Sequence, residues 1–224
     1  QHRLFYHKLG TAQSEDVVVF GDDKKRRYVM ANVTEDERFL VISAAESTSG
    51  NELYVKAINN GPIITVVDDF DSDTRVLHSD NDYLYMVTNR EAPNQKVVRA
   101  PIEKMTPDHW EDVIPETKNV LSANTGGGYI FAEYMVDAIS QVKQYSTDGT
   151  LKREIELPGV GSAGGFGGKW DQKEIYYTFT NYITPTSIYQ LEVESGESTL
   201  YKAPEINFDP SGFESKQVFY QSKD

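Results

Sequence analysis

A repeat of about 45 residues is the feature that most constrains the fold of this 224-residue chain. Apolar runs rich in aromatic residues recur at nearly equal spacing, and each is preceded by a less regular segment and followed by two more polar ones. The four runs begin at Phe39, Tyr83, Tyr129 and Ile175. Four short strands per repeat of this length are typical of a β-propeller blade. A β-sandwich also has many short strands, but it gives no reason for equal spacing. The repeat therefore predicts an all-β chain.

The order of the segments predicts about four and a half four-stranded blades of a presumed seven-bladed β-propeller. The predicted blades are residues 28–70, 71–116, 117–158 and 159–204. Residues 1–21 hold two strands that match half of a preceding blade, so the chain is expected to begin in mid-blade. Residues 205–224 are expected to leave the last blade and to end in one further strand, Lys216–Asp224. No stretch has a sustained 3.6-residue period, so almost no helix is expected.

The composition is that of a water-soluble globular protein with an acidic surface. The formal net charge is −13, 38% of the residues are hydrophobic, and no apolar run is long enough to cross a bilayer. The one basic cluster, Lys24-Lys25-Arg26-Arg27, follows two aspartates and is predicted to be a solvated loop. An acidic surface repels phosphate backbones, so we expect neither nucleic acid nor membrane as a partner. The cytoplasm and the periplasm both remain open as locations.

Two glycine-rich patterns are the nearest approach to a catalytic or nucleotide-binding motif. Val160-Gly161-Ser162-Ala163-Gly164 differs from a nucleophile elbow by a valine in the first glycine position. The same stretch, read from Gly159, matches the spacing of a dinucleotide fingerprint. Both motifs need a helix directly afterwards, whereas Gly165-Phe166-Gly167-Gly168 predicts a flexible loop that enters a blade. We therefore predict no catalytic and no cofactor-binding residue here.

The sequence also lacks the residue patterns of a metal site. The chain has no cysteine, which excludes disulfides, thiolate zinc sites and a cysteine nucleophile. Residues 69–73 begin like a calcium-binding loop, but Thr74 and Asp80 stand where that loop needs glycine and glutamate. The four histidines have no metal-ligand spacing between them: His2, His7, His78 and His109. No metal site is predicted, and residues 69–73 are interpreted as a loop between blades.

Four sequence motifs resemble one known family. His7-Lys8-Leu9-Gly10-Thr11-Ala12-Gln13-Ser14-Glu15-Asp16 is similar to a stretch that links two blades in the propeller of the prolyl oligopeptidase family. Three later stretches resemble the same family in the same order. They are TNREAPNQKVVRA from Thr88, FTNYITPTSIYQLEV from Phe179, and VFYQSKD from Val218. The resemblance covers essentially the whole chain.

The resemblance implies a two-domain serine peptidase that cleaves short peptides after proline. In that family a seven-bladed propeller caps an α/β-hydrolase domain that carries a Ser–Asp–His triad. The chain would then be the capping and gating part, ending at the domain junction, with no catalytic residue and no activity of its own. Its partners would be the hydrolase domain and short proline-containing peptides. Exposed faces at the ends of the blade array could also lead to self-association.

The same resemblance points to two residues at the edge of the substrate pocket. Residues 34–43 align with a turn and strand of the family, and counting from them places Tyr28 and Thr48 where pocket-lining side chains are found. An arginine that some members carry nearby is replaced by Ala45. Packing at a blade edge is the alternative interpretation of Tyr28. The alternative for the whole chain is a stand-alone propeller that binds proteins or peptides, because propellers host many functions.

Overall fold

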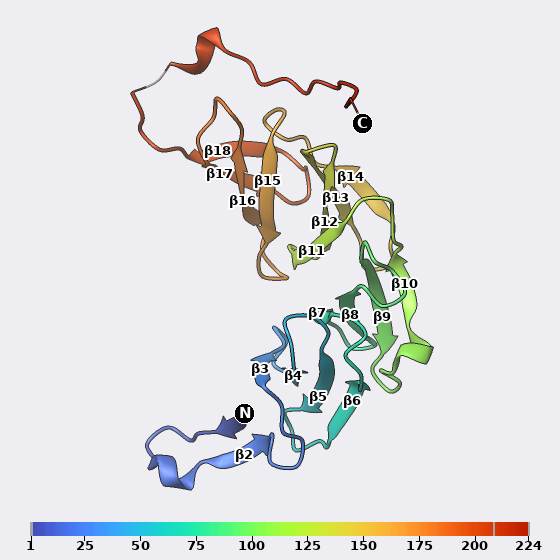
Figure 1. The fold of residues 1–224 in the computed structure, drawn as a ribbon. Coiled ribbons are helices and arrows are strands. Elements are labelled where there is room, and N and C mark those ends of the chain that lie inside the picture. The colour runs from blue at the N-terminus through green and yellow to red at the C-terminus, as the bar shows by residue number, and fades with distance from the viewer. Residues whose placement is uncertain (1, 208, 224) are drawn as a thin grey trace. The chain divides into compact units, whose positions relative to one another are not determined.

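The computed structural model describes residues 2–207 and 209–223, which divide into two compact units, residues 1–116 and 117–224. The described residues form β-strands and three short 3-10 helices, labelled in chain order in Figure 1. The elements of the first unit are β1 (Leu4–Tyr6), η1 (Gln13–Glu15), β2 (Val17–Phe20), β3 (Tyr28–Val33), β4 (Phe39–Ala45), β5 (Glu52–Ala57), β6 (Ile63–Val67), β7 (Thr74–Ser79), β8 (Tyr83–Thr88), β9 (Lys96–Pro101), η2 (Pro107–His109) and β10 (Glu111–Ile114). Those of the second are β11 (Leu121–Gly126), β12 (Tyr129–Val136), β13 (Ile139–Tyr145), β14 (Leu151–Glu154), β15 (Ser162–Gly167), β16 (Glu174–Thr180), β17 (Ser187–Glu192), β18 (Ser198–Lys202) and η3 (Pro210–Gly212).

Each unit contains two four-stranded antiparallel sheets whose strands pair in sequence order. The first unit has sheets β3–β6 and β7–β10 and the hairpin β1–β2, and the second has sheets β11–β14 and β15–β18. The second strands of three sheets begin at Phe39, Tyr83 and Tyr129, as the repeat predicts. In the fourth sheet, β16 begins at Glu174, one residue before the predicted Ile175. The predicted all-β fold with almost no helix is confirmed.

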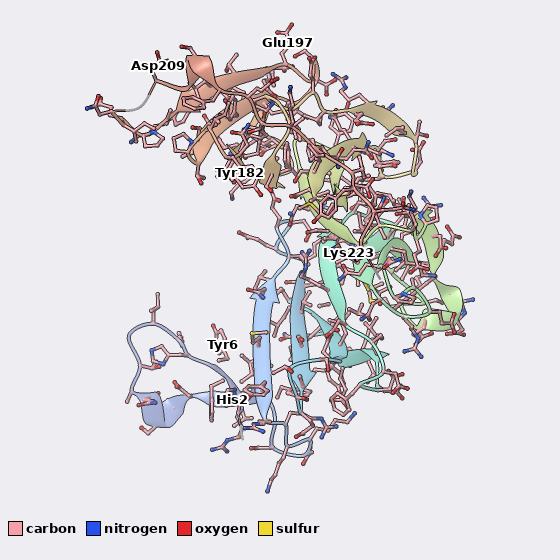
Figure 2. The ribbon with its side chains drawn as sticks, turned by 45° about the horizontal axis from the view of Figure 1, so that its top comes forward. His2, Tyr6, Tyr182, Glu197, Asp209 and Lys223 are labelled. Carbon is pink, nitrogen blue, oxygen red and sulfur yellow. The ribbon has the colours of Figure 1, made fainter. Side chains whose placement is uncertain are left out.

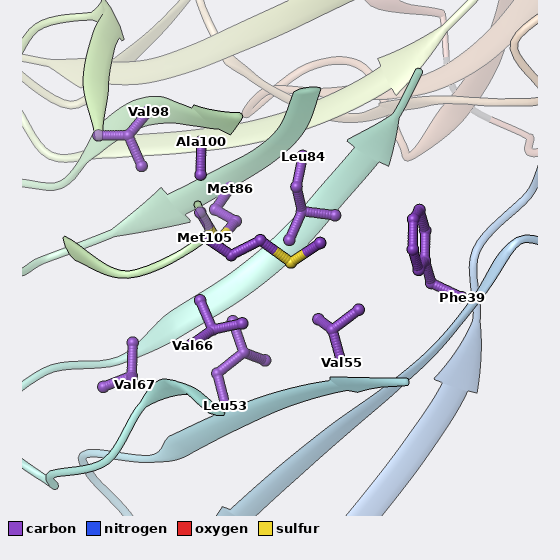
Figure 3. Close-up of a cluster of buried hydrophobic side chains, with 10 residues drawn as sticks. All are labelled: Phe39, Leu53, Val55, Val66, Val67, Leu84, Met86, Val98, Ala100 and Met105. Atoms are coloured by element: carbon purple, nitrogen blue, oxygen red, sulfur yellow. The ribbon is translucent and has the colours of Figure 1, made fainter. Parts of the chain in front are cut away.

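The core of the first unit lies between its two sheets. Figure 3 shows the cluster, in which Leu53 and Val55 of β5 face Leu84 and Met86 of β8. Residues 84–88 of β8 are all buried, so both faces of this strand are covered. Such burial explains why the strand is apolar at consecutive positions and not at alternate ones. Phe20 of β2 packs on Tyr54 with ring centroids 4.9 Å apart, which fixes the hairpin to sheet β3–β6.

An aromatic stack joins the two sheets of the second unit. The ring of Phe166 in β15 lies 4.3 Å from that of Tyr177 in β16 and 6.1 Å from that of Phe131 in β12. All three side chains are buried within one apolar cluster. Because Phe131 belongs to sheet β11–β14 and the other two to sheet β15–β18, the stack contributes directly to the contact between the sheets.

Two predictions about local structure are wrong. Gly165–Gly168 was expected in a flexible loop, yet strand β15 continues to Gly167, because Phe166 is buried in the aromatic stack and the strand pairs with β16. Lys216–Asp224 was expected to be a strand. Asp224 lies outside the described residues, and the part up to Lys223 is not a strand, because a strand needs a ladder partner and no described residue pairs with it.

Candidate functional site

The strand register places Tyr28 and Thr48 at the same edge of sheet β3–β6. Tyr28 is the first residue of β3 and pairs with Ala45, the last residue of β4. Thr48 is exposed in the loop that connects β4 to β5. The next strand, β5, starts at Glu52 opposite Ala44. The two residues predicted to line a pocket edge therefore lie at the same end of sheet β3–β6.

The ring of Tyr28 lies between a basic and an aromatic side chain. The guanidinium of Arg27 lies over the ring, 5.4 Å from its centroid, and His2 contacts it edge-on at 5.8 Å. The backbone N–H of Val29 donates to Nδ1 of His2 at 3.4 Å, which helps to hold the imidazole in place. Tyr28 is 39% exposed, so part of its apolar ring is accessible at the start of β3, next to the positive charge of Arg27. Such a surface can pack against a proline ring or an apolar side chain.

A buried ion pair fixes the segment that leads into Tyr28. Arg26 donates two hydrogen bonds, both 2.7 Å long, to the carboxylate of Glu52, whose side chain is only 3% exposed. Burial raises the pKa of Glu52, but the hydrogen bonds from Arg26 and Tyr54 outweigh it and leave that pKa below its usual value. Lys24 donates to the hydroxyl of Tyr54 at 3.1 Å. The predicted solvated loop is confirmed, since Lys24, Lys25 and Arg27 are exposed, and the structure adds that Lys24 and Arg26 are also bound to sheet β3–β6.

The loop that carries Thr48 is held against the loop between β6 and β7. Gly50 has a φ of +76°, and a Cβ at this position would lie 1.8 Å from the carbonyl oxygen of Phe70. Its N–H donates to Asp73 at 2.9 Å. Next to it, the side chain of Asn51 accepts from the N–H of Thr74 at 2.8 Å and donates to the carbonyl of Thr74 at 3.1 Å. Contacts between the two sheets of the first unit therefore hold the loop that carries Thr48 in place.

Residues 69–73, which resemble the start of a calcium loop, are used in contacts within the protein. Asp69 accepts two hydrogen bonds from Arg90, at 2.9 and 3.1 Å, and Asp73 accepts from Gly50. The loop connects β6 with β7, in agreement with the interpretation as a connection between two repeats. Among residues 2–207 and 209–223, no three or more potential ligands gather in a metal-binding group.

Ser162 lies in a strand and not on a strand-to-helix turn. It is the first residue of β15 and pairs with Thr180. Strand β15 continues through Gly164, so neither the nucleophile elbow nor the dinucleotide fingerprint has the helix that it requires. Across the described part of the chain, no helix is long and apolar enough to span a membrane.

A fully exposed tyrosine in the second unit escaped the sequence interpretation. Tyr182 lies in the loop between β16 and β17, which connects the same pair of strands in its sheet as the loop of Thr48 does in sheet β3–β6. Its side chain is 100% exposed and projects from the ribbon in Figure 2. Asn181 accepts from the N–H groups of Ile183 and Thr184, at 3.1 and 2.7 Å, so the loop is ordered. The dipeptide Asn181-Tyr182 is a recognisable turn signal, but only the structure shows the exposure of the ring.

Comparison with known proteins identifies relatives over the whole chain. The family described as "Prolyl oligopeptidase, N-terminal beta-propeller domain" matches residues 1–204. The prolyl endopeptidases of Elizabethkingia miricola and Elizabethkingia meningoseptica are 48% and 49% identical to this chain over 226 aligned residues. Each alignment covers 100% of this chain and 32% of the relative, so the chain spans about a third of the length of these proteins.

Solved structures of prolyl endopeptidases have the same fold. One, from a study of inter-domain dynamics in two prolyl endopeptidases, superposes with a TM-score of 0.86 at 30% identity. The alignment covers 98% of this chain and 33% of that one. Prolyl oligopeptidase B from Galerina marginata also gives a TM-score of 0.86, at 28% identity over 99% of this chain and 33% of its own. The sheets are therefore those of a β-propeller.

Proposed function

Since the chain belongs to the family of the prolyl oligopeptidase N-terminal β-propeller domain, we propose that it is the gating propeller of a serine endopeptidase that cleaves short peptides after proline. The observation that carries the proposal is the similarity to prolyl endopeptidases, which extends over the whole chain. A propeller over an active site lets short, unfolded peptides enter and excludes folded proteins. Gating of this kind protects the reaction from unwanted substrates without adding a catalytic group.

The proposal assigns the four sheets to blades of one larger propeller. The blades are residues 28–70, 71–116, 117–158 and 159–204, residues 1–21 form half of another blade, and residues 205–224 lead toward an α/β-hydrolase domain. The exposed side chains of Val218, Phe219 and Tyr220 support this direction, because apolar residues of that kind are normally covered by a partner. The hydrolase domain would supply the Ser–Asp–His triad.

Tyr28 and Thr48 form, in this proposal, part of the wall of the substrate pocket. The edge is rigid on the side of the propeller, because Arg26 and Gly50 fix the segments on which these residues lie. An exposed ring that is already held in place loses little conformational freedom when a peptide binds. Ala45, which pairs with Tyr28 in the ladder, adds no long side chain to this edge.

A second surface that we assign to a partner is the outer face of sheet β15–β18. Tyr176 and Tyr201 contact each other edge-on at 4.9 Å, and Tyr176 is 42% exposed. Tyr201 is exposed as well. We assign this face to a neighbouring blade of the same propeller, and in a chain without that blade, to a second copy. Sedimentation of the 224-residue chain tests this: a monomer at all concentrations contradicts it.

Hydrolysis of a proline-containing chromogenic dipeptide tests the proposed function. The full-length protein should cleave it, whereas the 224-residue chain alone should not. Tyr28→Ala should raise KM of the full-length protein, and the control Tyr6→Ala, which removes an exposed ring in β1, should leave it unchanged. A full-length protein that binds proline peptides without cleaving them would favour the peptide-binding scaffold. Turnover by the chain alone that Ser162→Ala abolishes would contradict the assignment of the chain as non-catalytic.

A further inference from the structure

The connection between β5 and β6 carries the only asparagine in the sequence that is followed by glycine. Asn60 and Gly61 lie in residues 58–62, which join the two strands (Figure 1). The φ of Asn60 is +65°, a left-handed conformation that asparagine adopts more readily than most residues. Asn60 is also exposed to solvent. Asparagine is a thermolabile residue, and glycine directly after it leaves the next backbone nitrogen uncovered.

The two groups that would react are not held by hydrogen bonds within the part of the chain that the structure describes. Neither the side-chain amide of Asn60 nor the N–H of Gly61 has a partner there. Asn60 donates only its own backbone N–H, to the carbonyl of Ile58 at 2.9 Å. Gly61 and Pro62 belong to neither a strand nor a hydrogen-bonded turn. The peptide between residues 60 and 61 can therefore turn without breaking a bond of the ladder.

Packing explains why glycine stands at position 61. A Cβ at this residue would lie 2.8 Å from the Cβ of Ala57, the last residue of β5. The carbonyl of Gly61 accepts a hydrogen bond from the ammonium group of Lys56, which holds the connection against the end of β5. The close approach leaves room only for a residue without a side chain. The same lack of a side chain leaves the nitrogen of Gly61 open to attack on its neighbour.

The connection between β13 and β14 shows how a similar pair of residues is protected. Asp148 is exposed and precedes Gly149, whose φ is +85°. The N–H of Gly149 donates to the carbonyl of Ser146 at 3.0 Å. The carboxylate of Asp148 accepts from the hydroxyl of Ser146 at 2.5 Å and from the N–H of Thr150 at 2.9 Å. The hydrogen bond from Ser146, followed by that from Thr150, lowers the pKa of Asp148 to about 2. The carboxyl therefore stays ionised at neutral pH, and an ionised carboxylate resists nucleophilic attack.

We propose that Asn60 is a site of spontaneous deamidation in the folded protein, whereas Asp148 is protected from the equivalent reaction. Hydroxide removes the proton from the backbone nitrogen of Gly61, and this nitrogen attacks Cγ of Asn60. A ring closes as the new C–N bond forms, the bond from Cγ to the side-chain nitrogen breaks, and ammonia leaves with a proton taken from water. Water then opens the cyclic imide at either carbonyl, which gives aspartate or isoaspartate at position 60.

The modification changes both the charge and the length of the connection. Each product carries one more negative charge than Asn60. Isoaspartate also places its Cβ in the main chain, so the connection becomes longer by one atom. Lys56 pairs with Ile63 directly beside it, and the ladder should loosen at this pair. Val66 and Val67 are buried in the core of the first unit and should keep the rest of β6 in place.

Incubation of the full-length protein at pH 7 and at pH 9, followed by tryptic peptide mapping, tests the proposal. The peptide of residues 57–75 should be converted at Asn60, and faster at pH 9, because hydroxide takes part in ring closure. Fragment spectra assign the change to one residue, and methylation by an isoaspartyl methyltransferase distinguishes isoaspartate from aspartate. The peptide of residues 144–152, which contains Asp148, should remain unchanged. Synthetic peptides of the same two sequences give the rates without the fold.

Two variants connect the reaction with this pair of residues. Asn60→Gly keeps a residue that tolerates positive φ but has no amide, so the conversion should be absent. The control Asn59→Ser leaves Asn60 and Gly61 in place and should be converted like the wild type. Asn60 that stays intact in the folded protein while the synthetic peptide is fully converted would overturn the proposal. Isomerisation of Asp148 in the folded protein as fast as in its synthetic peptide would show that the hydrogen bonds give no protection.

Discussion

Replacing Phe166 by alanine should destabilise the second unit strongly. The side chain is completely buried and stacks on Tyr177 at 4.3 Å, while its other neighbour, Phe131, belongs to the adjacent sheet. Removing a buried phenylalanine costs about 3–5 kcal/mol, which includes lost aromatic contacts and the cavity left behind. For a chain of this length the melting temperature should fall by roughly 6–20 °C. Circular dichroism and calorimetry of wild type and variant measure the change.

Tyr176→Ala is a matched control for this substitution. Tyr176 precedes Tyr177 in β16 but points to the other face of the sheet, where it is 42% exposed. Its loss should cost no more than about 1 kcal/mol. If Phe166→Ala destabilised the chain no more than Tyr176→Ala, residues 162–167 would be a surface loop, as their glycine content suggests, and the aromatic stack would not hold the sheets together.

Two further substitutions test the supports of the candidate edge, and a third tests the turn at the opposite end of the same sheet. Arg26→Ala removes two hydrogen bonds from the buried carboxylate of Glu52 and should lower the free energy of unfolding in urea by about 1.5–3 kcal/mol. An unchanged urea midpoint would show that the ion pair contributes nothing to stability. Gly50→Ala should lower the free energy of unfolding by at least about 1 kcal/mol, and by more than the control Gly10→Ala does. Both glycines have a positive φ, but only a Cβ at residue 50 meets Phe70. Equal losses of stability in thermal unfolding would contradict the close approach. Burial raises the pKa of Asp36, but hydrogen bonds from Thr34, Arg38 and Ser79 together lower it by more than burial raises it. The pKa of Asp36 is therefore below its usual value of 3.8. The ionised carboxylate of Asp36 therefore stabilises the fold above pH 3.8, and this stabilisation is lost as the pH falls through the lowered pKa. Acid unfolding should be less steep in Asp36→Asn than in the wild type. Identical acid-unfolding curves for the two proteins would refute this.

The strand content could be predicted from the sequence because the repeat is carried by the second strand of each sheet, which is rich in apolar and aromatic residues. This strand is buried on both faces in β8, whereas in β16 buried and exposed positions alternate. Tyr83 begins β8, in which residues 84–87 are apolar at every position. The glycine run at residues 164–168 could not be interpreted in the same way, since local propensity favours a loop and the burial of Phe166 depends on the adjacent sheet. The tail at residues 216–223 shows the opposite case, in which a strand-like pattern finds no partner among the described residues.

The location of Tyr28 and Thr48 at one end of the sheet could be predicted, whereas the residues that support them could not, and their role in a pocket stays a prediction. The alignment of a turn and strand was enough to expect Tyr28 and Thr48 at one end of the sheet, because the register of β3 with β4 determines both positions. Arg26 and Glu52 are 26 residues apart, and no local pattern connects them before the pairing of β4 with β5 is known. The contact of Phe131 with Phe166 could not be predicted for the same reason, since a contact between two sheets has no short-range signal.

A comparison of substrates of different size with the full-length protein tests the proposed gating role most directly. A proline-containing octapeptide and a folded protein that displays the same eight residues in an exposed loop are offered at equal concentration, and cleavage is followed by mass spectrometry. The gating propeller predicts rapid cleavage of the free peptide and none of the loop in the folded protein. Equal rates of cleavage for the two substrates would contradict it.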